Sequence, residues 1–252
     1  MKKLNVLSID FDYFQNITKH VLLHEYPDGI DQPTEIASII WASHYANPIS
    51  GKAILQVTPR KHDLQDIKRI IRSSSQRHTP DSVIVNSHQY AYDFVIDHIE
   101  NNPEFTHVNL VNIDTHHDLF NNNYTLDCGN WIDHLKQKLE NQERQLQVTW
   151  ITNPISTDIY GLTIEDFDGK ITTGFECIQD TTWDLIFLCR SDIWTPPHLD
   201  NEFVKLAHVI MNHSVSCDYE DTVMTSRYTN EFIENYKNIQ NQLYAAKAYA
   251  NK

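Results

Sequence analysis

The chain has 252 residues, of which 40% are hydrophobic and 11% aromatic, a composition typical of a packed globular protein and not of a disordered one. Its 34 acidic and 20 basic residues give a formal net charge of −14, which disfavours nucleic acid and anionic membranes as partners. Only 6 residues are glycine, and they form neither a G-x-G-x-x-G run nor a P-loop, so nucleotide binding through glycine-rich loops is disfavoured as well.

The four cysteines lie far apart and form no CxxC pair, which favours a reducing compartment. Near the N-terminus Asp10 and Asp12 interrupt the chain before any apolar run of signal-peptide length, and no stretch approaches 18 uncharged apolar residues. We therefore expect a cytoplasmic protein without a membrane-spanning segment. No repeat or Pro/Gly/Ser-rich linker divides the chain, so we expect a single domain over residues 1–252.

Short apolar runs rich in β-branched residues alternate with longer amphipathic segments. The short runs predict strands at residues 4–10, 53–57, 82–86, 107–114, 147–152 and 183–190. The longer segments predict helices at residues 62–73, 89–100, 131–141, 199–211 and 228–250. This alternation is typical of an α/β fold in which helices cover both faces of a mainly parallel sheet.

The sharpest motif is an Asp-x-His-x-Asp run at the end of the predicted strand 107–114. Alternate side chains of an extended segment point the same way, so Asp114, His116 and Asp118 are expected to converge. Asp10 and Asp12 stand at the end of the first strand, and His88 follows the strand 82–86.

Ligands bind at the carboxyl ends of parallel strands, where all six of these side chains are expected to lie. Six ligands with shared carboxylates suit two metal ions, whereas one ion needs three or four. Because the donors are oxygen-rich and include no thiolate, Mn²⁺ is favoured, with Zn²⁺, Co²⁺ and Fe²⁺ left open.

These motifs resemble those of the ureohydrolases, the arginase and agmatinase superfamily, which hold two Mn²⁺ ions between a strand-end His, an Asp-x-His-x-Asp motif and a Ser-x-Asp-x-Asp motif. The last of these corresponds to Ser8, Asp10 and Asp12, but here it comes first in the chain, as if the order were permuted. The permutation, together with the CGNW run at 128–131 and the RSDIWTPP run at 190–197, resembles an atypical branch that includes the peptide arginases. The resemblance implies the three-layer arginase/deacetylase-like fold.

The reaction that the resemblance implies is hydrolysis of peptidyl arginine to ornithine and urea, in a ribosomally made precursor peptide. A hydroxide held between the two metal ions attacks the guanidinium carbon, and Asp118 is expected both to bind metal and to orient the hydroxide. The departing amine needs a proton. His134 is our first candidate for its donor, with His117, His20 and His24 as alternatives.

A guanidinium group needs a facing carboxylate. The candidates are Glu25, Glu35, Glu176 and Asp192, with Asp192 preferred because it follows the strand 183–190. Asn130 matches an Asn that helps hold free arginine in the parent enzymes, but Ile132 stands near the place of the His that follows there, which agrees with a peptide substrate. Trp194, in a proline-rich loop, is a candidate for lining a peptide groove.

Three other functions stay open at this stage. The first is a small-molecule ureohydrolase acting on arginine, agmatine or a guanidino acid. The second is a deacetylase of the same broad fold, although such enzymes hold one Zn²⁺ and have no use for both His88 and Asp118. The third is a non-catalytic binding module in which the metal has only a structural role and holds the strand ends together. The oligomeric state is open as well.

Overall fold

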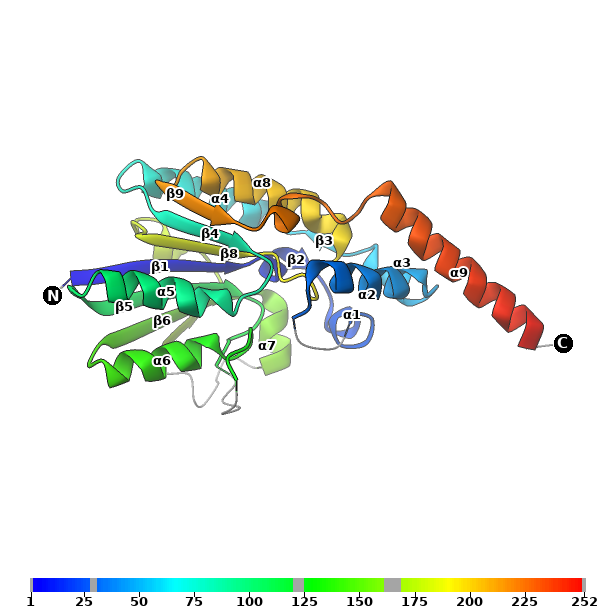
Figure 1. Ribbon diagram of the computed structural model, residues 1–252, viewed down its shortest axis with the longest axis horizontal. Helices are drawn as coiled ribbons and strands as arrows, with labels where there is room; N and C mark the ends of the chain where they lie inside the picture. Colours follow the sequence, from blue (N-terminus) through cyan, green and yellow to red (C-terminus); the bar gives the residue numbers. More distant parts are fainter. Residues whose placement is uncertain (1, 28–30, 120–124, 161–168, 251–252) are drawn as a thin grey trace.

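The computed structural model describes residues 2–27, 31–119, 125–160 and 169–250, and for residues 247–250 it describes the backbone only. At its centre lies a seven-stranded sheet in the order β7-β6-β5-β1-β8-β4-β9, and every pairing in it is parallel. Helices cover both of its faces (Figure 1), so the chain has a three-layer α/β architecture. The strands are β1 (Lys2–Asp10), β4 (Asp81–Val85), β5 (Phe105–Asp114), β6 (Gln145–Thr152), β7 (Gly169–Thr172), β8 (Leu185–Cys189) and β9 (Ser216–Tyr219).

Successive side chains of a strand point to opposite faces of the sheet, and both faces are buried. On β1, Leu4 and Val6 pack on one face with the helices α5 (Tyr90–Asn101) and α6 (Trp131–Asn141). Leu7 and Ile9 point to the other face, toward α4 (Lys61–Ser75) and α8 (Asp200–Met211). Strands buried on both faces read as continuous apolar runs, which is why the sequence identified the central strands so clearly.

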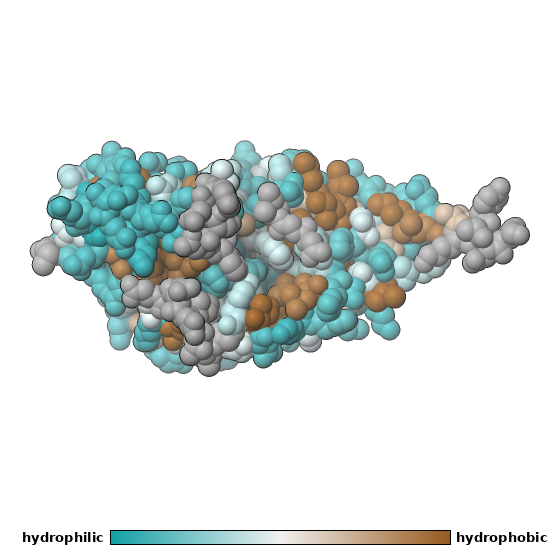
Figure 2. Space-filling model, turned by 90° about the horizontal axis from the view of Figure 1, so that it is seen from below, coloured by the Kyte–Doolittle hydropathy of each residue, from teal (hydrophilic) through white to brown (hydrophobic). Residues whose placement is uncertain are grey.

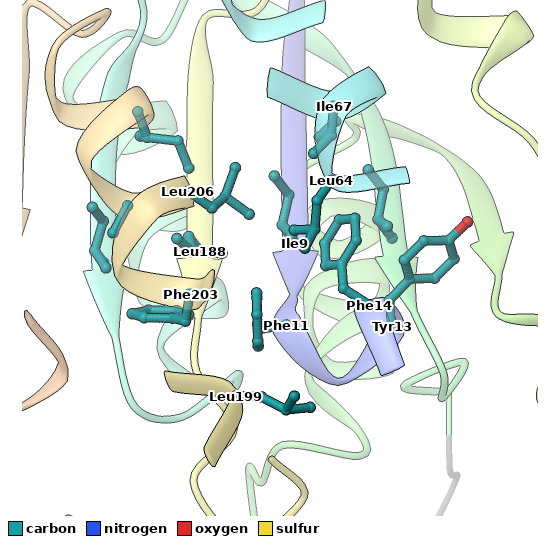
Figure 3. Packing of buried hydrophobic residues seen from close by; sticks show 14 of the residues in the cluster. Ile9, Phe11, Tyr13, Phe14, Leu64, Ile67, Leu188, Leu199, Phe203 and Leu206 are labelled. Atoms are coloured by element: carbon teal, nitrogen blue, oxygen red, sulfur yellow. The ribbon is translucent and has the colours of Figure 1, made fainter. Parts of the chain in front are cut away.

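Beyond the end of β1 the core continues into the short helix η1 (Phe11–Phe14) (Figure 3). The ring of Phe11 meets that of Phe203 edge-on at 5.4 Å between centroids, and Phe14 lies beside Leu64 in the same cluster. These contacts anchor the chain directly beside Asp10 and Asp12. A two-stranded antiparallel sheet follows, formed by β2 (Gln15–Asn16) and β3 (Thr58–Pro59).

The C-terminal helix α9 (Asn230–Ala250) packs against α2 (Thr34–Ala46) and extends away from the body of the molecule (Figure 1). Tyr45 of α2 contacts the rings of Phe232 and Tyr236, with centroid distances of 5.5 and 5.7 Å. On the face seen in Figure 2, apolar patches appear mainly in the half of the molecule that leads to the C-terminus. No helix in the described ranges combines the length and apolar character needed to cross a bilayer.

Five of the six predicted strands and all five predicted helices are confirmed, with ends shifted by a few residues. The strand predicted at 53–57 is wrong: the helix α3 (Ser50–Ile54) and a turn occupy this stretch. Ile54 and Val57 are buried while Leu55 is exposed, so burial there follows a helical spacing of three and not strand alternation. The helix α2 was not predicted, because Ile36 and Ile39 lie on its exposed side and obscure the apolar stripe. The helices α1 (Lys19–His24) and α7 (Pro154–Tyr160) and the edge strands β7 and β9 are too short to leave a clear pattern.

Candidate metal centre

Four neighbouring strands, β5, β1, β8 and β4, end at the same edge of the sheet, and all six predicted ligands lie at that edge. The first group is centred on His88, which follows β4. Its Nδ1 atom lies 3.1 Å from Oδ2 of Asp118, 3.2 Å from Oδ2 of Asp114 and 3.5 Å from Oδ2 of Asp10. All four side chains are almost completely buried.

The second group contains Asp12, Asp114 and His116. The Nδ1 atom of His116 lies 3.0 Å from Oδ2 of Asp12 and 3.5 Å from Oδ1 of Asp114. Asp114 therefore belongs to both groups and offers a different oxygen to each. The His116 side chain is 18% exposed, so the second group lies closer to solvent than the first.

The backbone helps to fix these carboxylates. Oδ1 of Asp10 accepts the N–H of Asp12 at 3.0 Å, and Oδ1 of Asp114 accepts the N–H of His116 at 2.7 Å. Asp118 adopts a left-handed backbone conformation, with φ of 54°, which residues other than glycine rarely take. Such strain at a buried carboxylate is typical of functional sites.

Three residues outside the predicted ligand set orient the first group. Ser8, two residues before Asp10 on β1, shares a 2.6 Å hydrogen bond with Nε2 of His88, which leaves Nδ1 facing the carboxylates. The indole N–H of Trp131 donates to Oδ2 of Asp118 at 2.6 Å. The side-chain amide of Asn112 lies 3.4 Å from both Asp114 and Asp118. Sequence reasoning missed the orienting roles of Trp131 and Asn112, because only the packing of α6 and β5 reveals them.

The residues fit divalent cations. Although Nδ1 of His88 faces three carboxylates, it makes no hydrogen bond within the described part of the chain, so a buried donor atom points into the group unsatisfied. Four carboxylates and two imidazoles are a donor set that Mn²⁺, Fe²⁺, Co²⁺ and Zn²⁺ all accept.

The electrostatics lead to the same conclusion. Burial, followed by the charges of Asp118 and Asp12, raises the pKa of Asp114 well above its ordinary value. Burial alone would lower the pKa of His88, but Asp118 above all, with Asp10 and Asp114, outweighs it and raises this pKa well above its ordinary value. The cluster therefore retains protons to offset its negative charge, and divalent cations would take their place on binding.

Cys189 also lies within metal-binding distance of Asp10 and His88, and sequence reasoning had not placed it there. It is the last residue of β8 and pairs with Asp10 across the strands. Burial, followed by the Asp10 charge, raises the pKa of its thiol well above the ordinary value. A protonated thiol is a poor ligand, so the carboxylates and imidazoles remain the preferred donors.

A cavity of about 90 Å³ opens beside the two groups. Its lining residues come from both groups and from two loops: Asp10, His116, Asp118, Cys128, Gly129, Ser191 and Trp194. The Trp194 ring lies 5.2 Å from that of His116. The structure thus brings Trp194, one of the three predicted substrate-binding residues, to the site.

The prediction for Asp192 is corrected by its contacts. Arg190 donates to both of its carboxylate oxygens, and Thr34 donates to Oδ2 at 2.6 Å. Arg227 approaches Oδ1 to 3.6 Å and binds buried Asp200 at 2.8 Å. Internal guanidinium groups therefore already neutralise Asp192, which is buried and does not line the cavity.

Asn130 is also committed to its own loop. Its Oδ1 accepts the N–H of Asp127 at 2.8 Å, and its Nδ2 donates to the carbonyl of Thr125 at 2.9 Å. With 1% of its surface exposed, it shapes the turn that leads into α6 and does not reach the cavity. Ile132 is fully buried, so it offers nothing to a substrate either.

The structure brings none of the four histidines considered as proton donors to the cavity. His134, the preferred candidate, lies beside Tyr92 of α5, with 6.5 Å between the ring centroids. His117 is buried, and its Nδ1 accepts the N–H of Leu119 at 3.0 Å. His20 and His24 lie together on α1, which does not line the cavity.

The other three carboxylates considered for guanidinium binding do not line this cavity either. Glu25 lies 3.6 Å from His20, and Glu176 borders a separate hollow near Tyr13. Glu35 borders a hollow of about 450 Å³ together with Asp31 and Glu220.

Comparison of the chain with protein-family models, with curated proteins and with solved structures found no match. The functional interpretation therefore depends on the geometry of the site and on the motifs of the sequence.

Proposed function

We propose that this chain is a hydrolase that depends on two divalent metal ions. The observation that carries the proposal is the position of Asp114, whose two oxygens face two different groups of ligands. A structural tetrahedral site needs four ligands around one ion, whereas six ligands that share a carboxylate suit a pair of ions.

Each ligand group has its own task in this proposal. His88, Asp10, Asp114 and Asp118 would hold the enclosed ion, and Asp12, Asp114 and His116 would hold the one nearer to solvent. Two bound cations would lower the pKa of a water between them and so supply a nucleophile near neutral pH. The carboxylate of Asp118, which lines the cavity, would orient that nucleophile by a hydrogen bond.

For the substrate we propose the guanidinium group of an arginine residue within a peptide, hydrolysed to ornithine and urea. The Asp-x-His-x-Asp and Ser-x-Asp-x-Asp motifs support the reaction through their resemblance to the ureohydrolases. The net charge of −14 favours a basic peptide. The small cavity suits the end of a side chain, and neither Asn130 nor Ile132 is available to hold a free amino acid.

We propose Mn²⁺ as the natural metal because the donors are mainly carboxylates and burial raises the pKa of both nearby thiols, Cys189 and Cys128, which keeps them protonated. Elemental analysis of protein purified without chelator should find about two Mn per chain. Stoichiometric Zn²⁺ at one ion per chain would contradict the two-ion proposal.

The activity test uses the full chain with Mn²⁺ and a panel of arginine-containing peptides. Mass spectrometry should show a loss of about 42 Da at an arginine, with urea in the supernatant. Free arginine and agmatine in parallel reactions test the small-molecule alternative. A protein that binds two ions but leaves every peptide and both small molecules unchanged would fit a non-catalytic binding module with structural metal ions instead.

A further inference from the structure

We infer that Trp131 is a positioning residue of the metal centre, which holds Asp118 and His88 in the geometry that the enclosed ion needs. The inference rests on the metal-binding part of the proposed function. Trp131 is the first residue of α6 and is completely buried.

Its first contact is with Asp118. The indole N–H donates to Oδ2 at 2.6 Å, a short bond of the kind that a charged acceptor makes. The same oxygen lies 3.1 Å from Nδ1 of His88. Asp118 lies in a loop, and the indole donor from α6 holds its carboxylate from outside that loop.

Its second contact is with His88 itself. The Trp131 ring lies 5.0 Å from the His88 ring, and Phe187 stacks on His88 at 5.6 Å with the planes 10° apart. Two aromatic rings therefore limit how the imidazole can turn, while Ser8 fixes which nitrogen faces the carboxylates. Trp131 is thus in contact with two ligands of the same candidate ion.

Three of the other four tryptophans differ from Trp131 in the partner of the indole N–H, and the fourth, Trp194, lies beside His116 of the second group, 5.2 Å from its ring. Those at 41 and 150 donate to backbone carbonyl groups, of Asp192 and Asp114 respectively. Trp183 is also fully buried, but its indole N–H has no partner among the described residues. It stands before β8, at the end of that strand away from the metal centre, and provides a matched control.

The test compares Trp131→Phe with Trp183→Phe in the full-length chain. Both substitutions remove an indole from the core, but only W131F removes a hydrogen bond to a ligand. We expect W131F to bind one of two Mn²⁺ ions at least about tenfold more weakly in calorimetric titration, as loss of an outer hydrogen bond typically does. The visible spectrum of the Co²⁺-loaded protein should change in W131F and not in W183F.

A purely structural role would lower the thermal stability of the metal-free protein without changing metal affinity or the Co²⁺ spectrum, and that result would overturn the inference. Should W131F fail to fold, the wild-type protein carries the test. The ¹⁵N-indole resonance of Trp131 should shift on titration with diamagnetic Zn²⁺ while that of Trp183 does not, and an unmoved Trp131 resonance overturns the inference.

Failure of the inference and failure of the proposed function give different results. If the wild-type chain binds two ions and W131F binds them equally well, the inference alone fails. If W131F binds one ion more weakly but the wild-type chain hydrolyses no guanidino compound, the proposed reaction fails and the positioning role stands.

Discussion

The shared position of Asp114 makes Asp114→Asn the most direct test of the two-ion interpretation. Asparagine has nearly the same shape and keeps an oxygen that can accept the 2.7 Å bond from the His116 N–H. It carries no charge, however, and its amide N–H₂ group would stand where Oδ2 of Asp114 now lies, 3.2 Å from Nδ1 of His88. The substitution therefore removes the ligand oxygen that faces His88 and leaves only a neutral oxygen for the second group, with little change in packing.

The expected effect has opposite signs with and without metal. Burial, with the charges of Asp118 and Asp12, raises the folded-state pKa of Asp114, so the metal-free fold loses stability as pH rises above the pKa of this carboxyl in the unfolded chain. Metal-free D114N should thus be at least as stable as wild type at neutral pH. For wild type, metal at 100 times its Kd adds about 2.7 kcal/mol, which raises Tm by about 5–10 °C in a chain of this size. D114N should lose most of that rise.

The assay is thermal denaturation, first in chelator and then with increasing Mn²⁺. Asp97→Asn is the matched control because Asp97 is an exposed aspartate on α5. It should keep the full metal-dependent rise. The reasoning is refuted if D114N shows the same rise as wild type and still holds two Mn per chain.

Three further substitutions test the surroundings of the site. Arg227→Met leaves Asp200 buried without its 2.8 Å partner, so the free energy of unfolding in urea should fall by about 3–5 kcal/mol, and a loss below 1 kcal/mol contradicts this. Ser191→Gly relieves a left-handed φ of 54° and should raise the metal-free Tm by about 2–4 °C, whereas a lower Tm argues against strain. Burial raises the pKa of Asp31 to about 6, so its ionisation costs folding free energy as pH rises from about 4 to 6. Asp31→Asn in chelator should thus gain up to about 3 kcal/mol at pH 7 and nothing below pH 4, and an equal gain at both pH values would contradict the cause.

Local pattern predicted most of the secondary structure because burial imposes a period on the sequence. The helix at 131–141 has the predicted ends, since its apolar residues Trp131, Ile132, Leu135 and Leu139 follow the helical spacing. The stretch 53–57 is apolar without alternation, and only its packing shows that it belongs to a helix and a turn. Four-residue edge strands such as β9 are too short for any period to emerge.

The sequence by itself determined which side chains could bind metal, because side chains two residues apart at the end of a strand point in the same direction. That rule placed Asp10, Asp114 and His88 at one edge before any contact was known. It could not say that Asp114 is shared by both groups, since this depends on β1 pairing with β5 on one side and with β8 on the other.

Only the tertiary structure decided which polar groups are free to act. Asp192 looked available at a strand end, but Arg227, 35 residues further along the chain, lies beside it and Arg190 neutralises it. Trp131 looked like an ordinary core residue until the packing of α6 placed its N–H against Asp118. Backbone periodicity is local and can be predicted from neighbouring residues, whereas the pairing of buried charges depends on contacts between distant segments.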